Sequence, residues 1–315
     1  MRTAFFHTLA ELAEKDQRIM LLTADLGYLA IEPFADKFPD RFINVGVAEQ
    51  NMVGMATGLA EAGFIPFTYS ISPFSTLRPY EFIRNGPIAH QLPVRIIGVG
   101  GGVDYSTNGL THYGLEDMGV MRTQPGISII IPADAAQVRS ALLATWNRSE
   151  PIFYRLGKGE QDQIPNLNGH FELGKVDILN SGDDLIIFSV GSITKEVLSA
   201  RDILLDQGIF PMLVLISSLN FEYTQEIAEL VSHYSLAISV EDHYVNSGLG
   251  SMISEIIAEN NLMCQLIRCG FKTTPDGLTG SKKYIYQKNM LSANELANTI
   301  TLAINKQHSK NSHRS

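Results

Sequence analysis

Residues 42–60, F-I-N-V-G-V-A-E-Q-N-M-V-G-M-A-T-G-L-A, contain a short apolar run that leads directly into a helical pattern. A strand is predicted over Phe42–Val45 and a helix over Ala48–Ala62, which ends at Gly63. Glu49 falls in the first turn of that helix. Open α/β sheets bind ligands at the carboxyl ends of their strands, so Glu49 is expected at a binding edge. On spacing alone, the favoured interpretation is an acidic residue that complements a helix N-terminus.

The same alternation of short apolar runs and helical patterns extends outward on both sides of this segment. Most of the runs are rich in β-branched or aromatic residues, and several run into Gly, Pro or Asp. This alternation is typical of mainly parallel sheets flanked by helices, so the predicted fold class is α/β. In the first half the strands are expected at Ile19–Ala24, Phe42–Val45, Ile65–Tyr69, Val94–Val99, Ser128–Ile131 and Ile152–Arg155.

The chain is predicted to form two domains. Periodicity is lost between Gly157 and Gly182, so we place a first domain at residues 1–156, a linker at 157–182 and a second domain at 183–305. Residues 306–315 have no apolar side chain and are expected to be a frayed tail. The strands of the second domain are expected at Asp184–Val190, Met212–Ile216, Leu236–Val240 and Gln265–Arg268, with helices at Thr194–Asp206, Thr224–Ser232 and Leu249–Asn260.

Composition excludes several classes of function. The chain of 315 residues has 24 basic and 33 acidic side chains, a net charge of −9, which argues against a nucleic-acid partner. The apolar runs fall well short of the roughly 20 residues of a membrane span, and no secretion signal is recognisable. Its two cysteines, Cys264 and Cys269, are too few for a disulfide framework. These features predict a cytoplasmic protein without a membrane partner.

Three motifs resemble those of one enzyme family. The segment V-G-V-A-E-Q-N-M, residues 45–52, resembles the signature of transketolases and deoxyxylulose phosphate synthases. The resemblance continues in T-H-Y-G-L-E-D, residues 111–117, followed by Arg122, and in P-I-F-Y-R, residues 151–155. It covers about residues 21–268 in the order that the family uses. It implies that the first domain is a pyrimidine-binding domain and the second is the transketolase C-terminal domain.

The resemblance implies thiamine diphosphate as the cofactor and a catalytic role for Glu49. A carboxylic acid bonded to N1′ of the aminopyrimidine favours the imino tautomer, whose N4′ removes the proton from the thiazolium C2. For this task, desolvation of Glu49 has to outweigh the pull of the helix N-terminus. Phe74 best matches the family's ring-stacking aromatic residue, whereas Ile71 stands where another aromatic is usual. Tyr69 and Asp25 are further expected cofactor contacts.

The substrate residues are also implied by the resemblance. His112, the second expected catalytic residue, would bond substrate oxygens and transfer protons near neutral pH. Arg155 would bind an anionic substrate through its planar fork of donors. Glu116 and Arg78 complete the expected substrate contacts.

The segment around Gly100 departs from the family pattern. Many transketolases have a phosphate-contacting histidine there, and Asn108 replaces a common aspartate, so the sugar substrates stay open. Glycines at 98, 100, 101 and 102 also invite a dinucleotide-binding interpretation. The third glycine of that fingerprint falls on Val103 and no helix start follows, which disfavours nicotinamide binding.

The family's magnesium segment is the remaining departure. Relatives hold the diphosphate through Mg²⁺ bound by G-D-G and a later Asn on a preceding domain. Here Gly182-Asp183-Asp184 lacks the second glycine, so no metal ligand is predicted in this chain. The resemblance therefore implies a partner, an N-terminal transketolase subunit that carries the diphosphate and magnesium site. An α2β2 heterotetramer acting on small sugars is expected.

The favoured function is transfer of a two-carbon ketol unit from a ketose to an aldehyde. The β subunit of a 2-oxoacid dehydrogenase E1 component has the same architecture, but the A-E-Q-N wording argues against it. The motifs also fit a deoxyxylulose phosphate synthase-like carboligase or a non-catalytic regulatory subunit. In the second domain, Glu241-Asp242-His243 and G-L-G-S at residues 248–251 resemble a family pair in an assembly domain. We assign them no catalytic role.

Overall fold

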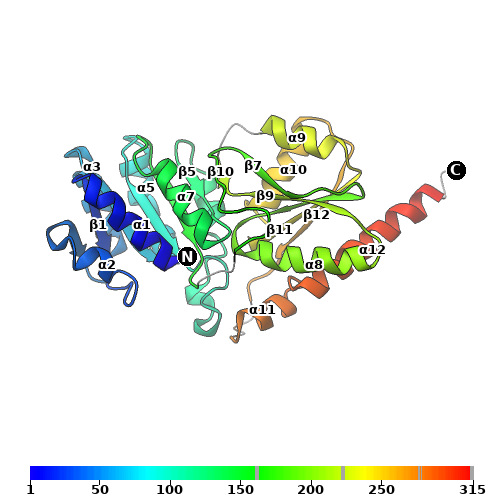
Figure 1. Ribbon diagram of the computed structural model, residues 1–315, viewed down its shortest axis with the longest axis horizontal. Helices are drawn as coiled ribbons and strands as arrows, with labels where there is room; N and C mark the ends of the chain where they lie inside the picture. The colour runs from blue at the N-terminus through cyan, green and yellow to red at the C-terminus, as the bar shows by residue number, and fades with distance from the viewer. Residues whose placement is uncertain (160–162, 221–223, 276, 278, 313–315) are drawn as a thin grey trace.

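The computed structural model of the chain describes residues 1–312 apart from 160–162, 221–223, 276 and 278. Two α/β domains lie side by side (Figure 1). The first contains a seven-stranded sheet of order β10-β5-β6-β4-β3-β1-β2, and the second a five-stranded sheet of order β12-β11-β8-β9-β7. The predicted fold class, two mainly parallel sheets flanked by helices, is confirmed.

Six strands of the first sheet run parallel, so their carboxyl ends meet at one edge. One face is covered by α1 and α7, and the opposite face by α3. Each predicted strand is present to within one or two residues. The strands are β1 (Ile19–Thr23), β2 (Phe42–Asn44), β3 (Ile65–Ile71), β4 (Arg95–Val99), β5 (Ser128–Ile130) and β6 (Ile152–Leu156), and the helices are α1 (Arg2–Lys15), α3 (Glu49–Glu61) and α7 (Ala135–Thr145).

Two helix ends show why the sequence folds as predicted. At the start of α7, Asp134 accepts a hydrogen bond from the Gln137 amide at 2.8 Å, as an N-cap residue does. After α3, Gly63 has φ +92°, a conformation that a side chain would strain. The shorter elements of the domain are α2 (Glu32–Ala35), α4 (Ser72–Thr76), α5 (Tyr80–Ile83) and α6 (Asp117–Arg122), with single turns at Pro39–Arg41, Arg84–Ile88, Ser106–Asn108 and Leu110–His112.

In the second domain, α8, α11 and α12 pack on one face of the sheet, and α9 and α10 on the other. The longest helix, α12, has 20 residues, and no helix in the described part of the chain is long and apolar enough to cross a bilayer. The elements of the second half of the chain are β7 (Val176–Asn180), β8 (Leu185–Ser189), α8 (Thr194–Asp206), β9 (Pro211–Ile216), β10 (Ser218–Leu219), which belongs to the first sheet, α9 (Thr224–Ser232), β11 (Leu236–Tyr244), α10 (Leu249–Glu259), β12 (Gln265–Phe271), α11 (Lys282–Lys288) and α12 (Ala293–Ser312), with a single turn at Gly191–Ile193.

Parts of the predicted linker and tail are ordered secondary structure. Strand β7 pairs antiparallel with β9 inside the expected linker, where its half-exposed residues gave no clear periodicity. The helix α12 continues to Ser312, because each further turn of an existing helix adds a hydrogen bond without a new nucleus. Strand β7 thus lies within the predicted linker, and α12 extends over residues 306–312, which we expected to fray. Residues 160–162 of the linker and 313–315 of the tail lie outside the described residues.

The two domains share one hydrophobic cluster. Val53 and Ile96 of the first domain belong to the same cluster as Phe188 and Ile253 of the second. Strand β10 comes from the second half of the chain, yet it pairs antiparallel with β5 at the edge of the first sheet. The junction between the domains is thus both packed and hydrogen-bonded.

Candidate functional site

Glu49 lies at the carboxyl edge of the first sheet, in the first turn of α3. The residue is only 1% exposed. Its Oε1 accepts a hydrogen bond from Ser70 Oγ at 2.9 Å, and its Oε2 lies 2.9 Å from Arg78 Nη1. Each carboxylate oxygen thus has a partner, one neutral and one cationic.

Phe74 and Arg78 form the next part of the group. Phe74 lies in α4, directly after β3, and Arg78 lies in the turn between α4 and α5. The guanidinium carbon of Arg78 is 3.9 Å from the centroid of the Phe74 ring. Arg78 therefore bridges the buried carboxylate of Glu49 and the aromatic face of Phe74.

His112 closes the group from a third segment, the loop after β4. Its ring is 5.2 Å from that of Phe74 in an edge-on arrangement. The imidazole is half-buried, and its Nδ1 lies 2.9 Å from Thr111 Oγ1. The structure thus brings together four of the residues that the sequence singled out, Glu49, Phe74, Arg78 and His112.

Tyr69 does not join this group. Its side chain is fully buried against α1, and its ring lies 4.8 Å from that of Phe6. Burial raises the pKa of its hydroxyl. Neighbouring strand residues point to opposite faces, and it is Ser70, the next residue, that reaches Glu49. Tyr69 therefore faces α1, and it is Ser70 that contacts Glu49, as the same alternation along β3 could have indicated.

Asp25 stays at the carboxyl edge, directly after β1. Its side chain is exposed, and its φ is +58°. Asn44, at the end of β2, donates from Nδ2 to Asp25 Oδ1 at 3.0 Å and accepts from the Asp25 amide at 3.1 Å. This exchange of hydrogen bonds ties together the ends of two neighbouring strands.

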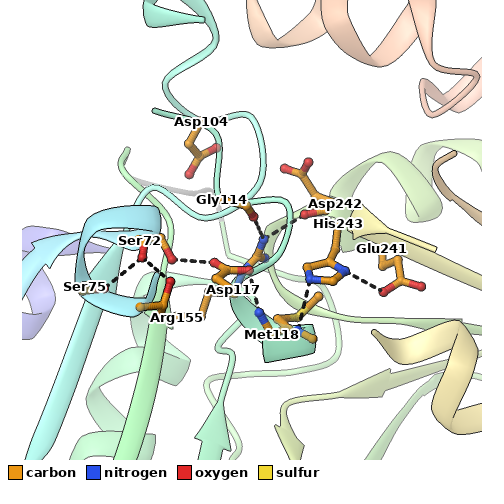
Figure 2. A network of polar contacts seen from close by, with 12 residues as sticks. Ser72, Ser75, Asp104, Gly114, Asp117, Met118, Arg155, Glu241, Asp242 and His243 are labelled. Atoms are coloured by element: carbon orange, nitrogen blue, oxygen red, sulfur yellow. Dashed lines mark hydrogen bonds and ion pairs between the residues drawn. The ribbon is translucent and has the colours of Figure 1, made fainter. Parts of the chain in front are cut away.

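Arg155 is enclosed at the junction between the domains, where it lies among Gly114, Asp117 and Asp242 (Figure 2). It is 6% exposed, its Nε donates to Asp117 Oδ2 at 2.8 Å, and its Nη2 donates to the carbonyls of Gly114 and Asp242 at 3.0 and 2.8 Å. A Cβ at Gly101 would lie 2.5 Å from Arg155 Nε, so this glycine leaves the space that the side chain takes. In this structure Arg155 holds three segments together, and its binding of substrate stays a prediction.

Further polar side chains fill the junction around Asp242. Tyr286 donates to Asp242 Oδ2 at 2.7 Å, and Lys282 donates to Asp104 Oδ1 at 2.5 Å. Burial raises the pKa of Asp242. In the described part of the chain, no group of three or more His, Cys, Asp or Glu side chains is placed to hold a metal ion.

Glu241 and His243 are also buried at the junction. Burial raises the pKa of Glu241 to about 7, although the Gly250 and Leu249 amides donate to it. His243 accepts from the Gly119 amide at 3.2 Å, and burial lowers its pKa. His243 thus joins the E-D-H segment to the first domain, and Glu241 joins it to the start of α10 within the second domain.

Glu116 also faces the second domain. It lines a surface groove of about 270 Å³ together with His243 and Ser247. Burial, followed by the charge of Asp117, raises its pKa. Arg122, from the same motif, pairs with Glu255 of α10. Both motif residues thus contribute to the domain junction.

Comparisons with known proteins agree with this architecture. The family description "Transketolase, pyrimidine binding domain" matches residues 1–162, and "Transketolase, C-terminal domain" matches residues 174–295. A Methanocaldococcus jannaschii protein, described as a candidate transketolase C-terminal section, is 35% identical over 86% of this chain and 85% of its own length. The 6-deoxy-6-sulfo-D-fructose transketolase subunit SqwH of Clostridium sp. strain MSTE9 is 32% identical over 94% of this chain and 92% of its own.

A solved structure is similar over nearly the whole chain. It is described as a split-gene transketolase in an inactive β4 tetramer. The TM-score is 0.84 at 29% sequence identity, and the alignment covers 96% of this chain and 98% of the other. The two-domain arrangement therefore has a close counterpart in a known protein.

Proposed function

The chain belongs to the transketolase family, and from this membership we propose that it is one subunit of a divided, thiamine diphosphate-dependent transketolase. The group formed by Glu49, Phe74 and His112 at the carboxyl edge of the first sheet carries the proposal. The proposed reaction moves a two-carbon ketol unit from a ketose to an aldehyde. We propose no particular sugar.

The side chains of this group suit an aminopyrimidine ring. Such a ring has a flat face and a nitrogen that bonds a carboxyl group. Phe74 offers an aromatic face, which is at present covered by a flat cation. Glu49 offers a buried carboxyl group fixed on one side by Ser70. The donor set therefore fits the cofactor that the family uses.

Each residue has a separate task in the proposed mechanism. When bound, the cofactor supplies a carbon nucleophile for the transfer of the ketol unit. Glu49 would hold the pyrimidine nitrogen and share a proton with it, and Phe74 would pack against the ring. His112 would bind substrate oxygens and move protons near neutral pH. Asp25 remains a proposed cofactor contact at the same edge.

The partner subunit is the second part of the proposal. A relative described as a C-terminal section, another described as a subunit and a split-gene structure support a divided enzyme. We propose that the partner holds the diphosphate and Mg²⁺ and that two copies of each chain form an α2β2 assembly. Glu116 and Arg155 are left out of the proposed site, because both face the domain junction.

Substitution of Glu49 tests the proposal in the enzyme reconstituted with its partner. Glu49→Gln keeps the shape but cannot share a carboxyl proton, so hydrogen–deuterium exchange at the cofactor's C2 should slow by about 10²–10⁴-fold. Glu61→Gln, an exposed change on the same helix, is the matched control. Unchanged exchange in Glu49→Gln, measured by NMR after acid quench, would contradict the assignment.

A further inference from the structure

Arg78 makes two contacts at once, and they are the two contacts that the proposed function assigns to the pyrimidine ring. Its guanidinium lies 3.9 Å above the face of Phe74. The same group places Nη1 2.9 Å from Glu49 Oε2. A guanidinium and an aminopyrimidine are both flat, and both present N–H groups in their plane. The guanidinium of Arg78 therefore occupies the position that the proposed function assigns to the pyrimidine ring.

We propose that Arg78 is a displaceable occupant of the ring position, which holds the site in a closed state until the pyrimidine arrives. This inference rests on the proposed function, because it takes the ring to bind between Glu49 and Phe74. Arg78 is then a positioning residue and not a substrate contact in this state. The guanidinium and the ring compete for the same two contacts, because the ring cannot pack against Phe74 and bond Glu49 while the guanidinium does.

Exposure shows which partner can move. The side chain of Arg78 is 41% exposed, whereas that of Glu49 is 2% exposed. Arg78 lies in the turn between α4 and α5, so its guanidinium can swing into solvent without moving either helix. Glu49 keeps its hydrogen bond to Ser70 when this happens. The carboxylate is thus fixed and its cationic cover is mobile.

The arrangement has a thermodynamic consequence for the free subunit. A buried carboxylate without a partner is costly, and Arg78 supplies that partner while the ring is absent. The ring has to displace Arg78 before it can bind. Its apparent affinity is therefore lower when a larger fraction of the molecules has the site closed by Arg78. Removal of the guanidinium should therefore weaken the free chain and tighten its hold on the ring, two effects of opposite sign from one change.

The test titrates the full chain with the free pyrimidine, 4-amino-5-hydroxymethyl-2-methylpyrimidine. NMR signals of the arginine Nε–H groups monitor the titration. In the wild-type chain the Arg78 signal should be shifted upfield by the Phe74 ring, and it should be absent in Arg78→Met. Titration with the pyrimidine should move it to the position of exposed arginines. Calorimetry should show at least about tenfold tighter binding to Arg78→Met than to the wild type. Arg84→Met, an exposed change nearby, should leave the affinity unchanged.

Several results would overturn the inference. One is a pyrimidine that binds, shown by other shifted signals, while the Arg78 signal stays in place. Another is equal or weaker binding to Arg78→Met, or no binding to it at any soluble concentration. The wild-type titration needs no variant to fold. The proposed function is judged separately by C2 exchange in Glu49→Gln, so either idea can fail while the other stands.

Discussion

Two arginine–carboxylate pairs at the carboxyl edge of the first sheet differ mainly in their exposure. Arg78 lies 2.9 Å from Glu49, with side chains 41% and 2% exposed. Arg155 lies 2.8 Å from Asp117, with side chains 6% and 0% exposed. Arg155 also donates to two carbonyl oxygens, whereas the other contact of Arg78 is an aromatic face. An exposed arginine can leave its carboxylate, and an enclosed one cannot.

This difference explains why similar pairs serve unlike purposes. A buried carboxylate that binds a ligand needs a partner that can leave, with water taking its position, when the ligand binds. A buried carboxylate that joins two domains needs a partner that never leaves. The fixed pair therefore belongs to the junction, and the exchangeable pair to the candidate active site.

The largest expected effect separates the two arginines by stability. Arg155→Met leaves Asp117 buried without its cation and should lower the free energy of unfolding by about 3–5 kcal/mol. Arg78→Met should cost only about 1 kcal/mol, because Ser70 still bonds Glu49 and water can reach the vacated position. Urea denaturation followed by circular dichroism gives both values. Equal losses in the two variants would remove the distinction between a fixed and an exchangeable pair.

Glu241 extends the comparison to a buried carboxyl group that has no arginine bonded to it. Its contribution to stability should depend on pH. Burial raises the pKa of Glu241 from its ordinary 4.5 to about 7. The folded chain then holds a proton that the unfolded chain has lost, so stability is full below pH 4.5 and falls as the pH rises to about 7. The loss should reach at most about 3 kcal/mol.

Glu241→Gln should lack this loss. The difference in unfolding free energy between variant and wild type, measured from pH 5 to 8, isolates the Glu241 contribution, because His243 titrates in both proteins. A difference that stays constant with pH would show that Glu241 is charged in the folded chain. The constant part of the difference reports the altered bonding to the Leu249 and Gly250 amides.

The smallest expected effect concerns a hydrogen bond from an uncharged hydroxyl group to Asp242. Tyr286→Phe removes the hydroxyl that donates to Asp242 Oδ2 at 2.7 Å. Lys282 lies 3.8 Å from the same oxygen and the Val103 amide still donates to the carboxylate, so the loss should be about 1 kcal/mol. Denaturation with urea measures it, with Tyr284→Phe on the same helix as the control. A loss in unfolding free energy as large as that of Arg155→Met would show that the stability of the junction depends on the bonds to Asp242 instead.

The sequence predicted the sheets and the edge of the site because those depend on local patterns. Apolar runs indicated the main strands, Gly63 indicated the end of a helix, and strand ends indicated the edge at which Glu49 and His112 lie. The contacts of Arg155 could not be predicted, because the end of a strand identifies an edge but not the direction of a side chain. Its partners come from distant segments, and one of them, Asp242, is in the other domain. Strand β7 was missed because its residues are mostly half-exposed and give only a weak pattern.

Strand β10 has a consequence for how the molecule forms during synthesis. The edge of the first sheet is completed only by residues 218–219, which leave the ribosome after the first strands of the second domain. Until then β5 exposes an unpaired edge, the kind of surface that recruits other chains. The two domains are therefore separate in sequence but not in folding. A nascent chain reaches its protected state only when translation has passed well into the second half.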